Sequence, residues 1–277
     1  MICFPYPKYL NAVMSTDQAA GALIASQSMA KKLGIPEENW IYWRGGAVEV
    51  EKPWFISDRN SYSDSPSMRN CHQAALAQAE LTLDEVDLID FYSCFPSAVS
   101  MACEMLGLAQ DDPRGFTLTG GLPYAGGPGN SYGFHALASA VTNLREKTGE
   151  HALLTGNGWY LTKHSATLLS RQPGESELRT DATSIPQAAR SEWQAPAVEI
   201  VAEANGAATV ETYTIVHDQD GAPSQGIIIG RLTESNQRFL SNTPADPELL
   251  ASLEEKELIG TQGTVQHENG RNVYKPA

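Results

Sequence analysis

The stretch GGLPYAGGPGNSYGFHALASAVTNLRE, residues 120–146, decides how the first part of this chain is expected to fold. Its first fourteen residues contain six glycines and two prolines. The residues that follow place Phe134, Leu137, Ala138, Val141 and Leu144 at helical spacing. The stretch therefore predicts a tight glycine-rich loop that leads into a helix. Such a loop lets a ligand approach the backbone, and the N-terminus of the helix offers free N–H groups.

The composition limits the classes of protein that fit this chain. Its 277 residues suffice for one large domain or two ordinary ones. The net charge of −14 argues against nucleic acid or an anionic membrane as the main partner. There is no run of eighteen apolar residues and no secretory signal pattern, so no membrane span is expected. The four cysteines lack zinc-site spacing, which predicts reduced thiols, no metal site and a cytoplasmic protein.

The regions on either side of the glycine-rich loop alternate between strand and helix patterns. The expected strands cover residues 40–50, 88–92, 151–158 and 160–170, and the expected helices cover residues 64–79 and 95–108. Capping boxes at Ser15–Gln18 and Thr82–Glu85 predict two more helical starts, the first running to about Leu33. This alternation predicts one α/β domain over residues 1–170.

The pattern changes after residue 170. Residues 171–196 are polar and contain prolines, which predicts a linker or a surface excursion. Residues 209–218, 225–232 and 261–274 read as strands, with a helix over residues 246–255, which predicts a small β-barrel over residues 197–277. In the first strand, Val210, Thr212, Thr214 and Val216 are expected on one face, and Thr209, Glu211, Tyr213 and Ile215 on the other. Tyr213 and Phe239 are interpreted as core residues.

Four segments of the first 170 residues resemble sequence blocks of the thiolase superfamily. FPYPKYLNAVMSTDQAAGALIASQSMAKKLGIP (4–36) is similar to the opening of the family's second half, and VDLIDFYSCFPSAVSMA (86–102) resembles the segment that carries its NEAF or HDxF motif. TGGLPYAGGPGNSYGFHALASAVTNLRE (119–146) resembles the GGxxxxGHPxGxxG block, and HALLTGNGWYL (151–161) resembles the CxGGG block. TVETYTIVHDQDGAPSQGIIIGRL (209–232) is similar to OB-like domains that follow some acetyl-CoA acetyltransferase-like members.

This resemblance implies a fold and an activity. The expected fold is a thiolase-like half, with a mixed sheet and helices on both faces, followed by the small OB-like barrel. We expect the N-terminal half, which carries the acylated cysteine of the family, to be absent from this chain. The implied activity is acyl transfer of the acetyl-CoA acetyltransferase type. A coenzyme A thioester would be the substrate or ligand, with no bound cofactor. The expected partners are acyl-CoA and either a second copy of the chain or the missing half.

The chain departs from the family at every catalytic position that the resemblance aligns. Gly127 falls at the histidine that acts as the base, and glycine cannot accept a proton. Tyr92 falls at the NEAF asparagine or HDxF histidine, and Thr155 or Gly156 falls near the second cysteine. An alternative function is therefore a non-catalytic module that binds acyl-CoA or docks a partner.

Three residues are candidate catalytic groups in this chain. Cys94 lies between a strand and a helix, where it is either a thiolate nucleophile or a buried, inert cysteine. His135 and His164 either replace the lost base or have structural roles. The candidate substrate-binding residues are Tyr92, Gly126, Gly127, Asn130, Asn157 and Gly158. For the two asparagines the alternative is a turn with positive φ, and for the loop glycines it is tight packing between the two halves of the family fold.

Overall fold

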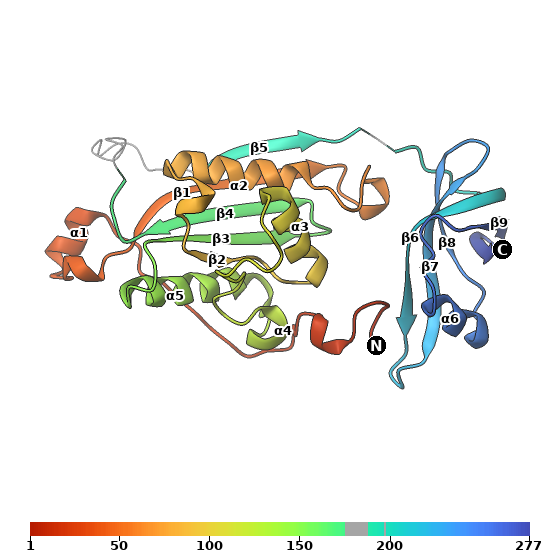
Figure 1. Ribbon diagram of the computed structural model, residues 1–277, viewed down its shortest axis with the longest axis horizontal. Helices are drawn as coiled ribbons and strands as arrows, with labels where there is room; N and C mark the ends of the chain where they lie inside the picture. The colour runs from red at the N-terminus through yellow and green to blue at the C-terminus, as the bar shows by residue number, and fades with distance from the viewer. Residues whose placement is uncertain (175–187, 197) are drawn as a thin grey trace. The chain divides into compact units, whose positions relative to one another are not determined.

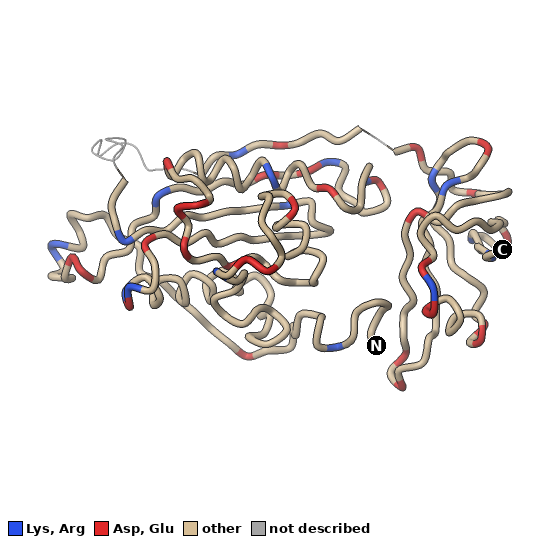
Figure 2. Tube along the Cα trace, in the orientation of Figure 1, with Lys and Arg blue, Asp and Glu red and all other residues tan. Residues whose placement is uncertain are grey.

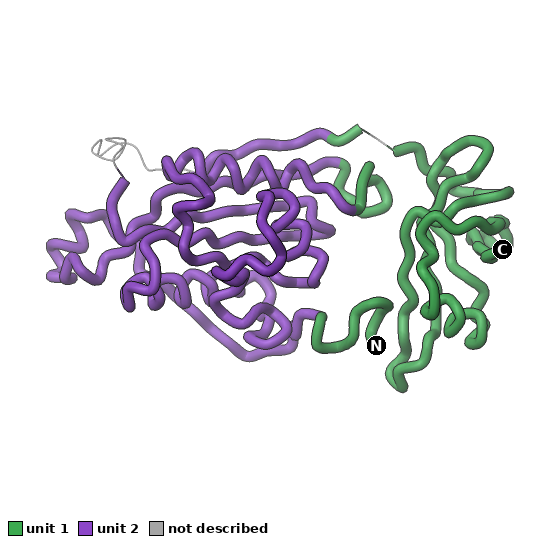
Figure 3. The backbone as a smooth tube through the Cα atoms, viewed as in Figure 1, with its two compact units in different colours: residues 1–10, 53–62, 195–277 green, residues 11–52, 63–194 purple. Residues whose placement is uncertain are grey.

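The computed structural model describes residues 1–174, 188–196 and 198–277, and it divides into two compact units (Figures 1 and 3). One unit comprises residues 11–52 and 63–194, and the other comprises residues 1–10, 53–62 and 195–277. Two segments that the sequence assigned to the α/β part, residues 1–10 and 53–62, thus belong to the unit that contains the barrel. Residues 1–10 are bonded to the barrel through their backbone, since the Phe4 N–H donates to the Ile215 carbonyl at 2.8 Å.

The first unit is built on a five-stranded sheet with the strand order β2-β3-β4-β1-β5. Its strands are β1 (Tyr42–Lys52), β2 (Leu88–Asp90), β3 (His151–Gly158), β4 (Lys163–Ser170) and β5 (Ala189–Gln194). The pairs β2/β3 and β1/β5 are parallel and the others are antiparallel, so the expected mixed sheet is confirmed.

The strand β5 lies within residues 171–196, which the sequence predicted to be a linker or a surface excursion, and it shows that part of this segment belongs to the sheet. It pairs with β1 at the edge of the sheet, and most of its side chains are exposed. A strand with both faces open has no apolar alternation by which a sequence could reveal it. Residues 175–187 of the predicted linker lie outside the described residues.

Helices cover both faces of this sheet (Figure 1). The long helices are α2 (Pro66–Ala79), α3 (Pro96–Leu106) and α5 (Tyr132–Arg145). Successive strand residues point to opposite faces. Leu153 and Leu168 pack in one core with α2 and α3, whereas Leu154 and Leu169 pack in the other with α5. Both faces are therefore buried, as the fold class predicted.

The helix predicted from Ser15 to Leu33 is wrong over most of its length. Only α1 (Gln27–Lys32) is helical, and Ser26 caps it by accepting from the Met29 N–H. The preceding residues bond to the glycine-rich loop instead. The Gln18 amide donates to the Ala125 carbonyl at 2.6 Å, for example. Contacts distant in sequence thus outweigh the local capping signal.

Short helical turns connect the remaining elements of both units. They are η1 (Lys8–Leu10), η2 (Glu37–Asn39), η3 (Ile56–Asp58), η4 (Leu83–Glu85), α4 (Leu122–Ala125) and η5 (Gly129–Ser131). The capping box predicted between Thr82 and Glu85 is present in η4.

The second unit contains the predicted small barrel. Its strands are β6 (Gly206–His217), β7 (Pro223–Leu232), β8 (Arg238–Asn242), β9 (Gln262–Glu268) and β10 (Arg271–Pro276). They close in the order β10-β8-β7-β6-β9, and the helix α6 (Pro247–Glu254) lies between β8 and β9 in the chain. Phe239 is fully buried and Tyr213 packs against the same core, as predicted.

The face assignment predicted for β6 holds only in its first part. The register of β6 against β7 shifts between Val210 and Thr212. A bulge adds one residue and reverses which side chains face inward. Accordingly Ala208 and Val210 are buried before the shift, and Ile215 is buried after it. The predicted single alternation over residues 209–218 is therefore wrong.

No helix in the described ranges is long and apolar enough to cross a membrane. Acidic and basic residues are distributed over both units (Figure 2).

Candidate active site

Three segments singled out by the sequence meet at the end of the first unit's sheet. They are residues 91–95 (the FYSCF turn), residues 120–131 (the glycine loop) and residues 155–158 at the end of β3. The Tyr92 N–H donates to Thr155 Oγ1 at 3.0 Å, and Asn157 Nδ2 donates to the Tyr92 carbonyl at 3.4 Å. The Leu122 N–H donates to Ser93 Oγ at 3.1 Å. The FYSCF turn is thus bonded to both neighbouring segments.

The glycine loop is filled by another segment of the same chain. Gly126 and Gly127 are buried. A Cβ on Gly126 would lie 2.7 Å from Thr16 Cγ2 and from Gln18 Nε2. The Gly127 N–H donates to the Val13 carbonyl at 2.8 Å. Both glycines are thus packed against residues of this chain; the alternative of packing between the two halves of the family fold stays a prediction.

A buried carboxylate anchors the glycine loop to the end of β2. Asp90 is fully buried and accepts from the Leu118 N–H at 2.8 Å and from Tyr132 Oη at 3.1 Å. Burial raises the pKa of Asp90, and the hydrogen bonds from Leu118 and Tyr132 oppose that shift. The sequence analysis missed this residue. The sequence feature that could have indicated Asp90 is a single acidic residue at the end of an apolar strand.

Cys94 lies in the FYSCF turn, partly buried, just before α3. Burial raises the pKa of its thiol, and the backbone N–H of Phe95 offsets part of that shift. Within the described ranges, no histidine is hydrogen-bonded to this sulfur. Burial thus disfavours the thiolate, which is the nucleophilic form of the cysteine.

The ring of His164 contacts groups other than Cys94. The residue is 2% exposed, and its Nδ1 lies 3.0 Å from Asn157 Oδ1. Its Nε2 lies 3.0 Å from the Leu161 carbonyl and 3.5 Å from Ser65 Oγ. A Cys94–His164 pair is thus not formed.

Comparisons with known proteins agree with this arrangement of segments. Residues 191–270 match the family model for the thiolase-like protein type 1 additional C-terminal domain. Two curated relatives named beta-ketoadipyl-CoA thiolase, from Acinetobacter baylyi, are 38% identical over 144 residues. That alignment covers 52% of this chain and 33% of each relative.

A solved structure matches the chain over its full length. It is a monomeric SCP2-thiolase-like protein type 1 from Mycobacterium smegmatis, with a TM-score of 0.80 and 36% identity. The match covers 100% of this chain and 59% of that protein. This chain is similar to thiolase-superfamily proteins in sequence and in fold. It spans about a third of the length of the curated thiolases and about three fifths of the solved relative.

The other candidate residues of this thiolase-like chain do not gather at Cys94. His135 is the fourth residue of α5, which begins at Tyr132. Its Nε2 is buried and has no hydrogen-bond partner among the described residues. Asn130 is exposed in η5. The positive φ predicted for Asn130 belongs to Gly129, at 58°.

Asn157 and Gly158 both lie within β3. The positive φ considered for Asn157 is also wrong, because Asn157 has extended strand backbone. Across the described ranges, no group of three or more His, Cys, Asp or Glu side chains is placed to hold a metal ion.

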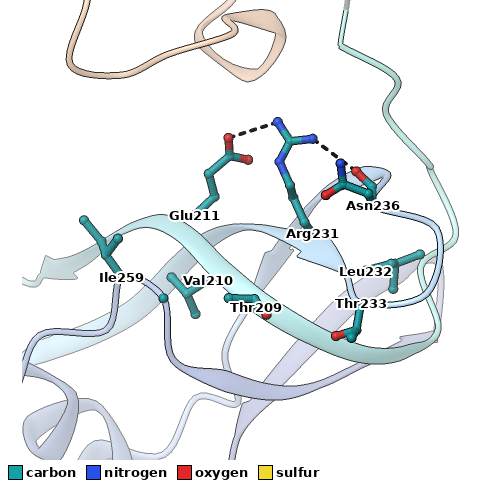
Figure 4. A pocket seen from close by; sticks show the side chains of 9 residues that line it. Thr209, Val210, Glu211, Arg231, Leu232, Thr233, Asn236 and Ile259 are labelled. Carbon is teal, nitrogen blue, oxygen red and sulfur yellow. Dashed lines mark hydrogen bonds and ion pairs between the residues drawn. The ribbon is translucent and has the colours of Figure 1, made fainter.

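The barrel of this thiolase-like chain carries a groove of about 520 Å³ (Figure 4). Its lining residues are Thr209, Val210, Glu211, Arg231, Leu232, Thr233, Asn236, Ile259 and Gly260. In this groove the Arg231 guanidinium lies 3.1 Å from the Glu211 carboxylate and donates to the Asn236 carbonyl, and Glu211 also pairs with Arg238. One carboxylate thus faces two guanidinium groups, which leaves this cluster with a net positive charge.

Proposed function

We propose that this thiolase-like chain binds a coenzyme A thioester but does not itself transfer the acyl group. The observation that carries the proposal is the surroundings of Cys94. Acyl transfer needs a thiolate and a base that generates it. Gly127, which aligns with the family's basic histidine, is buried against residues 12–18, and the ring nitrogens of His164 contact Asn157 and Leu161.

The ligand class rests on the relatives and on the local backbone. The curated relatives are named for a CoA thioester. The glycine loop leads into α5, a helix of fourteen residues. The first backbone N–H groups of a helix can donate to a thioester carbonyl or a phosphate. Acyl transfer would then require a thiolase N-terminal half that supplies the nucleophilic cysteine.

A second candidate function is the docking of such a partner. Met14, Leu23 and Ile24 are 78%, 78% and 84% exposed. Large apolar side chains that are this exposed are candidates for an interaction site. We propose that this segment binds the thiolase N-terminal half or a second copy of the chain. Light scattering with and without that half distinguishes a pair from a monomer, and a clean monomer in both cases contradicts this candidate.

We also propose a cytoplasmic location. The cysteines Cys3, Cys71, Cys94 and Cys103 are all free. Free thiols are typical of a reducing compartment. Cell fractionation with an antibody to the chain tests this, and recovery outside the cytoplasm contradicts it.

Calorimetric titration and a turnover assay test the main proposal together. Acetyl-CoA is titrated into the chain, with adenosine as a control ligand that lacks the thioester. Thiolysis of acetoacetyl-CoA is followed in parallel. The proposal expects saturable binding of acetyl-CoA and no thiolysis. Turnover by the chain alone would establish the enzyme alternative, whereas absence of binding would leave only the docking function.

A further inference from the structure

Two side chains of β3 hold both backbone polar groups of Tyr92. Thr155 Oγ1 accepts the Tyr92 N–H at 3.0 Å, and Asn157 Nδ2 donates to the Tyr92 carbonyl at 3.4 Å. Tyr92 lies two residues before Cys94. The position of the FYSCF turn therefore depends on how the Asn157 amide is oriented.

His164 fixes that orientation. Because the NH₂ group of Asn157 faces a carbonyl, its Oδ1 faces His164 Nδ1, at 3.0 Å. Asn157 Oδ1 and the Leu161 carbonyl, which lies 3.0 Å from Nε2, can only accept hydrogen bonds, so both ring nitrogens carry a proton when the amide has this orientation. The opposite orientation of the amide would place two oxygens, those of Asn157 and Tyr92, against each other. The protonation of the His164 ring and the orientation of the Asn157 amide are therefore linked.

His164 is in turn seated in a buried polar chain between β4 and the start of α2. Its Nε2 lies 3.5 Å from Ser65 Oγ, which lies 3.3 Å from Ser67 Oγ. The Ser67 hydroxyl donates to Glu51 Oε2 at 2.5 Å. Ser65 and Ser67 are fully buried, and Glu51 is 2% exposed. Buried polar chains of this kind restrict their members to one arrangement.

We propose that His164 is a positioning residue whose Nδ1–H fixes Asn157, and that Asn157 in turn holds the FYSCF turn that carries Cys94. This deepens the proposed function and rests on it only in assigning that turn to the ligand site. This role differs from that of a base, because His164 acts through Asn157 and does not contact the Cys94 sulfur.

Native-state alkylation of Cys94 by iodoacetamide, located by peptide mass spectrometry, measures how firmly the turn is held. The variants are His164→Gln, Asn157→Ala and the double substitution. The loss of one net hydrogen bond should raise the Cys94 alkylation rate by about two- to tenfold in each single variant. The double variant should exceed neither, because both substitutions break the same connection.

A matched control comes from the barrel, where His267 Nδ1 lies 2.9 Å from Asn272 Oδ1. His267→Gln removes the same kind of pair far along the sequence from the turn, and it should leave the Cys94 rate unchanged. Unchanged rates in both single variants, with native circular dichroism, would overturn the proposal. Equal acceleration by His267→Gln would do so too, because it would indicate general loosening.

Nitrogen-15 NMR of the unmodified chain tests the proposal even where a variant fails to fold. The expected spectrum at neutral pH shows a proton on His164 Nδ1. A ring protonated on Nε2 alone would overturn the proposal. Neither experiment uses coenzyme A. A failure to bind acetyl-CoA would therefore defeat the proposed function and leave this inference standing.

Discussion

Tyr132 Oη donates to Asp90 Oδ1 at 3.1 Å, and this hydrogen bond joins the end of β2 to the first residue of α5. Both side chains are fully buried. Tyr132→Phe removes the donor while the ring stays, so Asp90 loses one of its partners. We expect the free energy of unfolding to fall by about 1–3 kcal/mol in urea titration. Tyr124→Phe is the control, because Tyr124 is 79% exposed. Equal effects of the two substitutions would refute this anchoring role.

His72 gives the fold a dependence on acid. It is buried against Phe91, neither ring nitrogen has a hydrogen-bond partner among the described residues, and burial lowers its pKa from 6.5 to about 4. A lowered pKa means that the folded state excludes the proton. The stability that the neutral His72 ring gives to the fold is complete above pH 6.5 and is lost as the pH falls towards 4. The free energy of unfolding should fall by about 3 kcal/mol over this range.

The substitution His72→Leu removes this titrating group at similar volume. Urea midpoints between pH 7 and pH 4 should then fall less steeply than in the unmodified chain. If both proteins lose stability in parallel over this range, His72 is not the source of the acid sensitivity.

Arg238 should stabilise the barrel unit far more than Arg231 does. Arg238 is fully buried, its Nε donates to Glu211 at 2.7 Å, and its Nη1 donates to the Ser57 carbonyl at 2.6 Å. Arg238→Met should lower the free energy of unfolding by about 3–5 kcal/mol, because buried acceptors lose their donor. Arg231→Met, at a partly exposed pair with the same carboxylate, should cost about 0–1 kcal/mol. Similar losses in thermal or urea unfolding would contradict this difference.

Gly126 should tolerate no side chain. Its φ of 88° with ψ of 150° is a conformation restricted to glycine, and a Cβ would overlap Thr16 and Gln18. Gly129 also has a positive φ, at 58°, but no atom within 4 Å of the added Cβ. Gly129→Ala should cost about 1–2 kcal/mol from backbone strain alone. Gly126→Ala should cost clearly more in the same urea titration, and an equal cost would show that residues 12–18 do not pack on the loop.

The sequence predicted those helices and strands whose formation depends on the residues within them. The apolar positions of α5 and the strand over His151–Gly158 follow from helical spacing and from a bounded apolar run. The segment after Ser15 did not become a helix, because its bonds go to the distant glycine loop, as with Gln18 and Ala125. A single sequence carries no sign of such a contact.

The candidate site was predicted as a set of segments but not as a set of contacts. The FYSCF turn, the glycine loop and the end of β3 meet in the structure. The pairings within the site differ, because His164 bonds to Asn157 and not to Cys94. Residue spacing cannot show which nitrogen faces which oxygen. Asp90 was missed for a related reason, since its three-dimensional partners Leu118 and Tyr132 lie well apart from it in the sequence.

The most direct test of the central claim is the mass of the intact chain after incubation with acetyl-CoA. A protonated Cys94 thiol without a base should not take up the acyl group. The expected result is therefore an unchanged mass under conditions in which calorimetry shows that acetyl-CoA is bound. A mass increase of one acetyl group, located on Cys94 by peptide mapping, would contradict the claim and establish an acyl-enzyme.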